Sequence, residues 1–168
     1  MEAIYAIDLN NGLSKNGTIP WTCKKDMSFF MNKTKNNVVI MGKNTYFSLP
    51  IEHRPLRNRL NIVLTTEHLI SESPDLIITN YSAIHRTILN NREKFCELYK
   101  YLKKDFIIFI IGGKIIYEQF IPLCNCVWVT RLKNDYNCDL FMNYDYSNHS
   151  SEVYEEDDEL TIIKYTRK

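Results

Sequence analysis

Two short stretches of the sequence combine glycine with a cation or a hydroxyl in a way that suits phosphate binding. In the first, an apolar run ends at Gly42, and Lys43 and Thr45 follow; in the second, the glycine pair 112–113 precedes Lys114. Glycine lets a ligand approach the backbone, and free N–H groups at a helix start stabilise phosphate. Each motif alone is better explained by a glycine that a tight strand-to-helix turn requires. Two motifs in one small sheet favour a ligand with several phosphates, although neither matches the Rossmann fingerprint or the P-loop.

A third stretch places an acid beside aromatic residues. Residues 16–21 contain Asn-Gly and Pro, which mark a loop, and a helical pattern begins after Trp21. In that pattern Asp26 lies one turn before Phe30, at the edge of an apolar stripe. Burial there would raise the pKa of the carboxyl and suit it to hold or supply a proton near neutral pH. The alternative, which this segment taken alone favours, is a solvated first-turn residue that the helix dipole stabilises.

The elements that must position these residues follow from apolar periodicity. Short β-branched runs predict strands at residues 4–9, 37–41, 60–65, 76–79, 106–111 and 126–132. Helical patterns lie between them at residues 24–33, 43–49, 82–89 with an extension toward 102, and 114–120. Because strands and helices alternate, we expect an α/β fold with a predominantly parallel twisted sheet covered on both faces. Ligands of such sheets collect at the carboxyl ends of the strands.

The end of the chain has a different pattern. Three further strand patterns, at residues 136–141, 151–154 and 160–166, follow one another without helices and predict an antiparallel C-terminal edge hairpin. The acidic run 155–159 would be a solvated turn between the last two. We therefore expect a single domain, residues 1–168, with about eight strands and about four flanking helices.

Composition restricts the partners. The chain has 168 residues, 19.9 kDa and a formal net charge of +1, which argues against nucleic acid as the partner. Its longest apolar run, residues 106–111, is short of the ~20 residues of a membrane helix, and the N-terminus does not resemble a signal peptide. The five cysteines form no CxxC pair and match no closed zinc pattern. We expect a cytoplasmic protein without a metal site. We also expect a monomer, although composition does not decide the oligomeric state.

Taken in order, the motifs resemble dihydrofolate reductase over nearly the whole chain. The motifs that carry the resemblance are Ala6-Ile7, Asn16-Gly17-Thr18-Ile19-Pro20-Trp21, Asp26, Met41-Gly42-Lys43-Asn44-Thr45, Arg54-Pro55-Leu56, Arg59, Ile111-Gly112-Gly113, Tyr117-Glu118 and Thr130. Each is common, but the series in this order is not. The resemblance implies NADPH-dependent reduction of 7,8-dihydrofolate to tetrahydrofolate, with hydride added to C6 and a proton to N5, in support of one-carbon metabolism and thymidylate synthesis.

The resemblance also implies the substrate site. Asp26 would bind N3 and the 2-amino group of the pterin and support protonation of N5 through a water that Trp21 helps to order, while Thr130 would hydrogen-bond to Asp26. Arg59 would bind the glutamate α-carboxylate in a bidentate pair, although Arg57 competes for this role. The remaining substrate contacts would be the main chains of Ile4 and Ile111 and the side chains of Met27, Phe30, Leu49 and Leu56.

The implied cofactor is NADPH. The backbone of Ala6 and the chain near Leu13 would hold the nicotinamide carboxamide, with Tyr117 close to the ring. Lys43 and Thr66 favour NADPH over NADH, because the added phosphate takes a cation and a donor. The rest of the implied cofactor set is Gly42, Asn44, Thr45, Leu64, Thr65, Ile111, Gly112, Gly113, Lys114 and Ile115.

The chain departs from the family's pattern at three places. Arg57-Asn58 replaces a Pro-Gly pair before the substrate arginine, and since Asn tolerates positive φ, the turn can survive. Lys114 stands where a small residue is usual, which would shift pyrophosphate contacts onto it. Ser14 stands where glycine is frequent in the mobile active-site loop, which affects loop kinetics rather than chemistry.

Three other interpretations share some of these features. A riboflavin-pathway pyrimidine reductase would share the glycines and NADPH but not the spacing from Trp21 to Asp26. A noncatalytic nucleotide-binding or RNA-binding module is disfavoured by the net charge of +1 and by the complete set of Asp26, Thr130 and Tyr117. The reductase half of a fusion with thymidylate synthase is disfavoured because 168 residues leave no room for the synthase.

Overall fold

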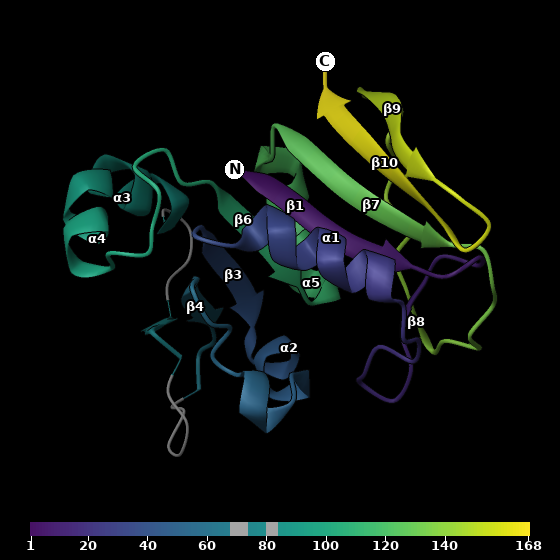
Figure 1. Cartoon of the computed structure of the whole chain (residues 1–168), viewed down its shortest axis with the longest axis horizontal. Coiled ribbons are helices and arrows are strands. Elements are labelled where there is room, and N and C mark those ends of the chain that lie inside the picture. The colour runs from purple at the N-terminus through teal and green to yellow at the C-terminus, as the bar shows by residue number, and fades with distance from the viewer. Residues whose placement is uncertain (68–73, 80–83) are drawn as a thin grey trace.

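The computed structural model describes residues 1–67, 74–79 and 84–168. An eight-stranded sheet runs through the molecule in the order β5-β4-β3-β6-β1-β7-β10-β9 (Figure 1). Its strands are β1 (Glu2–Ile7), β3 (Val38–Gly42), β4 (Leu60–Leu64), β5 (Leu76–Ile78), β6 (Ile108–Gly112), β7 (Cys126–Leu132), β9 (His149–Glu156) and β10 (Leu160–Arg167). A separate two-stranded sheet pairs β2 (Gly12–Ser14) with β8 (Leu140–Phe141).

The described helices are α1 (Lys24–Thr34), α2 (Lys43–Ser48), α3 (Ile84–Asn90), α4 (Arg92–Leu98) and α5 (Lys114–Phe120), with short 3₁₀ turns η1 (Ile51–His53) and η2 (Ile121–Leu123). Strands β5, β4, β3, β6, β1 and β7 pair in parallel, whereas β10 is antiparallel to both β7 and β9. The predicted parallel sheet with an antiparallel C-terminal edge hairpin is therefore confirmed.

Both faces of the sheet are covered, as the runs of consecutive apolar residues predict. In β1, Tyr5 and Ile7 pack into one core cluster together with Phe120 of α5, while Ile4 packs into the other together with Phe29 of α1. Side chains of a strand alternate between faces, so continuous apolar strands need a helix layer on each side. Figure 1 shows α1 in front of the sheet and α5 behind it. This arrangement places the first turn of α1 over the sheet.

The predicted strand at 136–141 is wrong in length and in place. Two residues, Leu140 and Phe141, form β8, and this strand pairs with β2, which the sequence analysis did not predict. Asn137 has φ 52°, a left-handed conformation that interrupts an extended strand. The segment before it instead hydrogen-bonds to the chain that follows β1, through bonds such as that from the Leu9 N–H to the Asn134 carbonyl (3.0 Å).

The predicted long helix from 82 toward 102 is two helices, α3 and α4, so the described helices number five rather than about four. Asn91 separates them with a backbone that leaves the helical region (φ −114°, ψ 26°). The expected start at residues 82–83 lies outside the described residues. Strand β9 is longer than predicted, and the hairpin turn is shortened to residues 157–159 of the acidic run.

The first strand begins and ends two residues earlier than predicted. It ends at Ile7 because the backbone N–H groups of the next two residues bond outside the eight-stranded sheet: that of Asp8 donates to the Gly12 carbonyl (2.9 Å), and that of Leu9 donates to the Asn134 carbonyl (3.0 Å). N–H groups with these partners are not available to extend the strand ladder. Across the described residues, no helix is long and apolar enough to cross a bilayer, and no cluster of His, Cys, Asp and Glu could hold a metal ion.

Candidate active site

The two glycine motifs meet at the carboxyl ends of neighbouring strands. Gly42 ends β3 and Gly112 ends β6, and these parallel strands pair with each other. A Cβ atom on Gly113 would lie 3.2 Å from the Thr45 hydroxyl, and one on Gly112 would lie 3.3 Å from the hydroxyl of Tyr117. Gly112 also has φ +129°, which side chains rarely adopt. The two strand ends therefore approach each other closely at glycine backbone.

Two lysines flank these strand ends. Lys43 pairs with the exposed Glu67, and the Lys114 ammonium lies 3.8 Å from a carboxylate oxygen of the half-exposed Glu118. Surface pairs of this kind contribute little to stability, because water screens both charges. Both cations can therefore exchange these partners for a phosphate at little cost in free energy.

The other residues of the expected cofactor set differ in what they can offer. Leu64 is buried at the end of β4, so its backbone is what a ligand could reach. The Thr65 hydroxyl accepts the Glu67 N–H at 3.1 Å. Side chains exposed at the rim are Asn44, Thr66 and Ile115. On the neighbouring strand β1, Ala6 is half-buried, and Leu13 of β2 packs against the core.

The predicted acid is half-buried at the start of α1. Burial raises the pKa of Asp26, and a hydrogen bond from Thr130 of β7 partly offsets this increase. Thr130 itself is 1% exposed. This environment differs from the solvated first-turn position that the sequence left open, and it suits a carboxyl that holds a proton closer to neutral pH.

Thr130→Val is expected to raise the pKa of Asp26 further. The valine keeps the shape of the side chain but removes the hydroxyl that stabilises the carboxylate, while burial remains. A carbon NMR titration of the Asp26 carboxyl measures the change. Thr161→Val is the matched control, because its hydroxyl donates to Glu156 instead. An unchanged or lower pKa in Thr130→Val would contradict the role of this hydrogen bond.

Two aromatic side chains border the same space. The Tyr117 hydroxyl donates a hydrogen bond to the Ile4 carbonyl (2.9 Å), and burial raises the pKa of Tyr117 well above its ordinary value, so it stays a neutral donor. The Trp21 ring is 7% exposed, and its buried indole N–H has no acceptor within the described part of the chain. Because a buried donor without an acceptor is costly, this N–H is suited to donate to a water or ligand atom that reaches it.

An apolar wall lies next to these groups. Phe30, Leu49 and Leu56 pack, partly buried, against the core cluster that contains Ile4, Trp21 and Ile111. The structure thus brings together three of the four side chains expected to line the substrate. Met27 is the exception, since its side chain is 58% exposed and belongs to neither core cluster.

The far end of this wall holds a buried cation. Arg59 is 7% exposed and donates to the Thr34 hydroxyl (2.8 Å), the Met31 carbonyl (3.2 Å) and the carbonyl of Arg57 (2.8 Å). No carboxylate of the described residues lies within ion-pair distance of it, and burial lowers its pKa. A buried cation without an anion is costly, so this guanidinium suits an anionic ligand.

The turn before Arg59 survives the loss of the Pro-Gly pair. Asn58 has φ 57°, the left-handed conformation that asparagine tolerates, as the sequence analysis expected. Arg57 is exposed, in contrast to the buried Arg59. The two candidates for a carboxylate partner therefore differ in burial, and the role of Arg59 stays a prediction.

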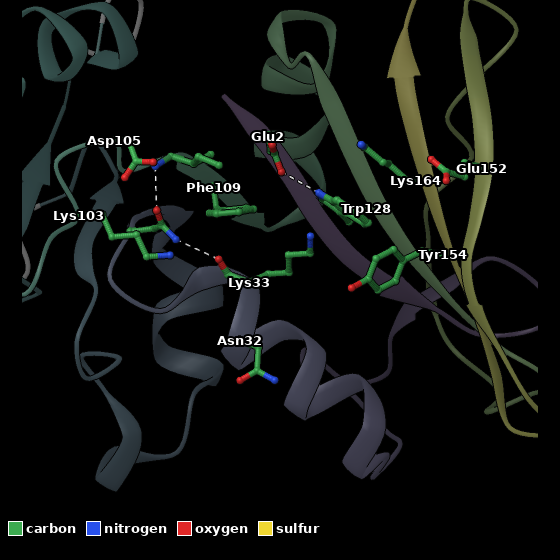
Figure 2. Close-up of a pocket in the computed structure, with 12 residues that line it drawn as sticks. Glu2, Asn32, Lys33, Lys103, Asp105, Phe109, Trp128, Glu152, Tyr154 and Lys164 are labelled. Carbon is green, nitrogen blue, oxygen red and sulfur yellow. Dashed lines mark hydrogen bonds between the residues drawn. The ribbon is translucent and has the colours of Figure 1, made fainter.

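A groove of about 600 Å³ lies elsewhere, near the amino ends of β1, β3 and β6 (Figure 2). Trp128 forms part of it and donates a hydrogen bond from its indole N–H to Glu2 (2.7 Å), while the Lys33 ammonium lies 3.6 Å from the centre of the Trp128 ring. None of the predicted site residues lines this groove. Its charged residues, which include three lysines and three carboxylates, balance one another.

A second acid, Asp8, is buried close to this site and was not predicted from the sequence. Asp8 is fully buried, and its contacts include Tyr136, whose ring centre lies 5.4 Å from that of Trp21. The one signal in the sequence is a lone acid directly after an apolar strand. Its partners Asn10 and Gly12 are local, but the N–H of Tyr136 is 128 positions away, so spacing alone cannot identify the complete set of donors.

Comparisons with known proteins show which family the chain is similar to. A family model described as dihydrofolate reductase matches residues 1–167. The dihydrofolate reductase of Ureaplasma parvum serovar 3 is 34% identical over 168 residues, which are 100% of this chain and 97% of that protein. The bifunctional dihydrofolate reductase-thymidylate synthase of Daucus carota is 34% identical over 150 residues. These residues are 84% of this chain and 28% of that longer protein.

A solved structure supports the same fold. It is dihydrofolate reductase from Enterococcus faecalis complexed with NADP(H) and RAB-propyl, and it superimposes with a TM-score of 0.73. The match covers 99% of this chain and 95% of that chain at 24% sequence identity, so it shows a shared architecture. With the family match over residues 1–167 and a relative 34% identical along its length, the chain belongs to the dihydrofolate reductase family.

Proposed function

We propose that the chain catalyses the reaction of its family, the NADPH-dependent reduction of 7,8-dihydrofolate to 5,6,7,8-tetrahydrofolate. In this reaction hydride from NADPH adds to C6 of the pterin and a proton adds to N5, which leaves NADP⁺. One arrangement carries the proposal: a half-buried acid and a buried unpaired arginine lie at opposite ends of α1, along one apolar wall. Asp26 begins this wall, and Thr34, which holds Arg59, is eight residues later, or about 12 Å along the helix.

Asp26 is proposed to bind the pterin and to support the protonation of N5. The carboxyl would pair with N3 and the 2-amino group in a bidentate arrangement and support protonation of N5 through water. Its raised pKa supports this role, because the group then retains a proton closer to neutral pH. Thr130 would limit the shift, and the unpartnered indole N–H of Trp21 would orient the water.

The wall and Arg59 are proposed to hold the rest of the substrate. Phe30, Leu49 and Leu56 would enclose the benzoyl ring, and Arg59 would bind the glutamate α-carboxylate with a bidentate pair. The carbonyls of Ile4 and Ile111 would contact the exocyclic side of the pterin. Met27, with its exposed side chain, can contact substrate at the rim of the site.

NADPH supplies the hydride, and the residues at the strand ends suit its parts. The glycine backbone at 112–113 and the cations Lys43 and Lys114 would face its phosphates. Thr66, which is exposed after β4, would face the 2'-phosphate. Tyr117 would lie beside the nicotinamide, whose carboxamide would bond to the backbone of Ala6 and the chain near Leu13.

We further propose a cytoplasmic monomer that folds as one domain, residues 1–168, with dihydrofolate and NADPH as partners and neither nucleic acid nor a membrane. The near-neutral charge supports the absence of a nucleic-acid partner, and the odd number of cysteines without a CxxC pair supports a reducing compartment. Light scattering tests the monomer, which a dimer would contradict. A urea titration tests the single domain, which two separate unfolding transitions would contradict.

The assay that tests the proposed function mixes purified protein, NADPH and dihydrofolate and follows the cofactor absorbance. We expect NADPH oxidation that depends on dihydrofolate and that slows when NADH replaces NADPH. A pyrimidine substrate of the riboflavin pathway is the matched alternative, and we expect no reaction with it. Oxidation that depends on the pyrimidine, or none with dihydrofolate, would contradict the proposal.

A further inference from the structure

The buried Asp8 carboxylate collects hydrogen bonds from two separate segments. Oδ1 accepts the backbone N–H groups of Asn10 (2.9 Å) and Gly12 (2.7 Å), and Oδ2 accepts the backbone N–H of Tyr136 (3.1 Å). The thiol of Cys138 also hydrogen-bonds to this carboxylate. Asp8 is 0% exposed, and the proposed function assigns it no role. One side chain thus joins the segment between β1 and β2 to the segment between β7 and β8.

The donors around Asp8 require a carboxylate. Burial on its own raises the pKa of Asp8, but the three backbone N–H groups and the thiol lower it by more, to below its ordinary value. Burial and the neighbouring carboxylate raise the pKa of Cys138 to about 11, so the thiol keeps its proton and donates. No lysine, arginine or histidine among the described residues pairs with Asp8. The charge is therefore stabilised by N–H and S–H donors.

The two segments fit together without spare room. A Cβ atom on Gly12 would lie 2.4 Å from the Cβ of Cys138 and 2.8 Å from the Cγ of Asp8. Further along, the Asp139 carboxylate accepts the Asn16 N–H (2.8 Å), and β2 pairs with β8. Because atoms packed this closely cannot move past one another, the position of the segment that contains Gly12 fixes that of the segment that contains Cys138.

The two segments that Asp8 joins contact or include residues of the proposed active site. Tyr136, held by Asp8, places its ring centre 5.4 Å from that of Trp21. Gly12, also held by Asp8, precedes Leu13, which is expected beside the nicotinamide carboxamide. We propose that Asp8 is a positioning residue for hydride transfer, which acts by fixing Trp21 through Tyr136 and Leu13 through Gly12. This inference rests on the proposed function.

Asp8→Asn tests the inference at nearly constant shape. The amide keeps an oxygen for Asn10 and Gly12 but turns an NH₂ group toward the N–H of Tyr136, so donors face donors. We expect hydride transfer in single turnovers to slow by roughly 10- to 100-fold, as for misplaced reacting groups, with KM for dihydrofolate changed by no more than about twofold. Asp145→Asn is the matched control, because that exposed carboxylate also accepts a backbone N–H, from Ser147.

An NMR spectrum provides a readout that does not depend on activity. The chain has two tryptophans, so it gives two indole N–H signals. In Asp8→Asn the signal of Trp21 is expected to shift, whereas that of Trp128, bonded to Glu2 in the groove of Figure 2, should stay in place. A shift of both signals would mean general unfolding, and an unshifted Trp21 with a wild-type rate would overturn the inference.

A second pair of variants covers the case in which Asp8→Asn does not fold. Gly12→Ala forces a Cβ atom against Cys138, so it is expected to slow hydride transfer by roughly tenfold. Adding Cys138→Gly removes two of the three close contacts and should recover part of the rate. An unaffected Gly12→Ala would also overturn the inference. An inactive wild type would instead contradict the proposed function, so the two failures are distinguishable.

Discussion

Replacing Asp26 with asparagine is expected to lower the rate of hydride transfer at pH 7 by about 30- to 900-fold, or about 2 to 4 kcal/mol of transition-state stabilisation. The amide keeps the shape of the side chain, but it can neither carry the proton nor form the charge-assisted pair with the pterin. Single-turnover oxidation of NADPH with dihydrofolate measures the change. A variant that kept the wild-type rate at pH 7 would remove Asp26 from the mechanism.

The pH dependence separates the proton role from simple binding. Burial raises the pKa of Asp26, so in the wild type the rate should fall as pH rises through this raised pKa and the carboxyl loses its proton. In Asp26→Asn this step is absent, and the rate should recover partly at low pH, where the substrate is protonated before it binds. A variant with the wild-type pH profile would contradict the assignment.

The stability of the same variant controls for misfolding. Because the pKa of Asp26 is raised above its unfolded value of about 3.9, the unfolded chain binds fewer protons than the folded chain between the two pKa values. The contribution of this group to stability therefore decreases as pH rises through that window, so Asp26→Asn is expected to be as stable at pH 7 as the wild type, or more so. Urea denaturation measures the free energy of unfolding of both proteins. If the variant were unfolded, its lower rate would reflect lost structure and not the lost acid.

Asp8 has the opposite linkage, although both acids are carboxyl groups in the same region. Its pKa is lowered, so its contribution is present above the ordinary pKa of an aspartate and is lost as pH falls through the folded value. The cause is the number of donors: three backbone N–H groups and a thiol for Asp8, against one hydroxyl for Asp26. A structural carboxylate is fully satisfied, whereas Asp26 remains poorly solvated and costly to ionise.

The parallel core of the fold was predictable because its signal is local. Helix α5 and strand β7 have the predicted bounds, since each is an apolar run of the right period with clear ends. The segment at 136–141 and the helix after residue 82 were not predictable in this way. Their ends depend on single asparagines, Asn137 and Asn91, whose backbone conformation is decided by tertiary contacts.

The residues of the candidate site likewise differ in whether local sequence could predict them. The glycine motifs could be predicted because each combines all its chemistry within a few residues. Asp8 could not, since the backbone N–H of Tyr136 that completes its set of donors is 128 positions away. A preference for Arg59 over Arg57 likewise depends on the burial of Arg59, which the sequence does not reveal. The two arginines carry the same charge and lie on either side of Asn58.

Replacing Arg59 with leucine is expected to raise KM for dihydrofolate by roughly 10- to 150-fold, or about 1.5 to 3 kcal/mol, the usual range for lost hydrogen bonds to a charged group. The value of kcat should change little, because the glutamate carboxylate is remote from C6 and N5 and contributes equally to the ground and transition states. Arg57→Leu is the matched control, since that side chain is exposed in the same turn. An effect confined to Arg57→Leu would reassign the carboxylate to Arg57.

A substrate without the glutamate tests the same contact from the other side. With 7,8-dihydropteroate, which lacks the α-carboxylate, the wild type should already show the high KM of Arg59→Leu, and the substitution should add little further. Arg59→Lys should fall between the two, because an ammonium keeps the charge but cannot form the bidentate pair. If Arg59→Leu weakened both substrates equally, its hydrogen bonds to Thr34 and Met31 would be the cause, and Arg59 would have a structural role on α1.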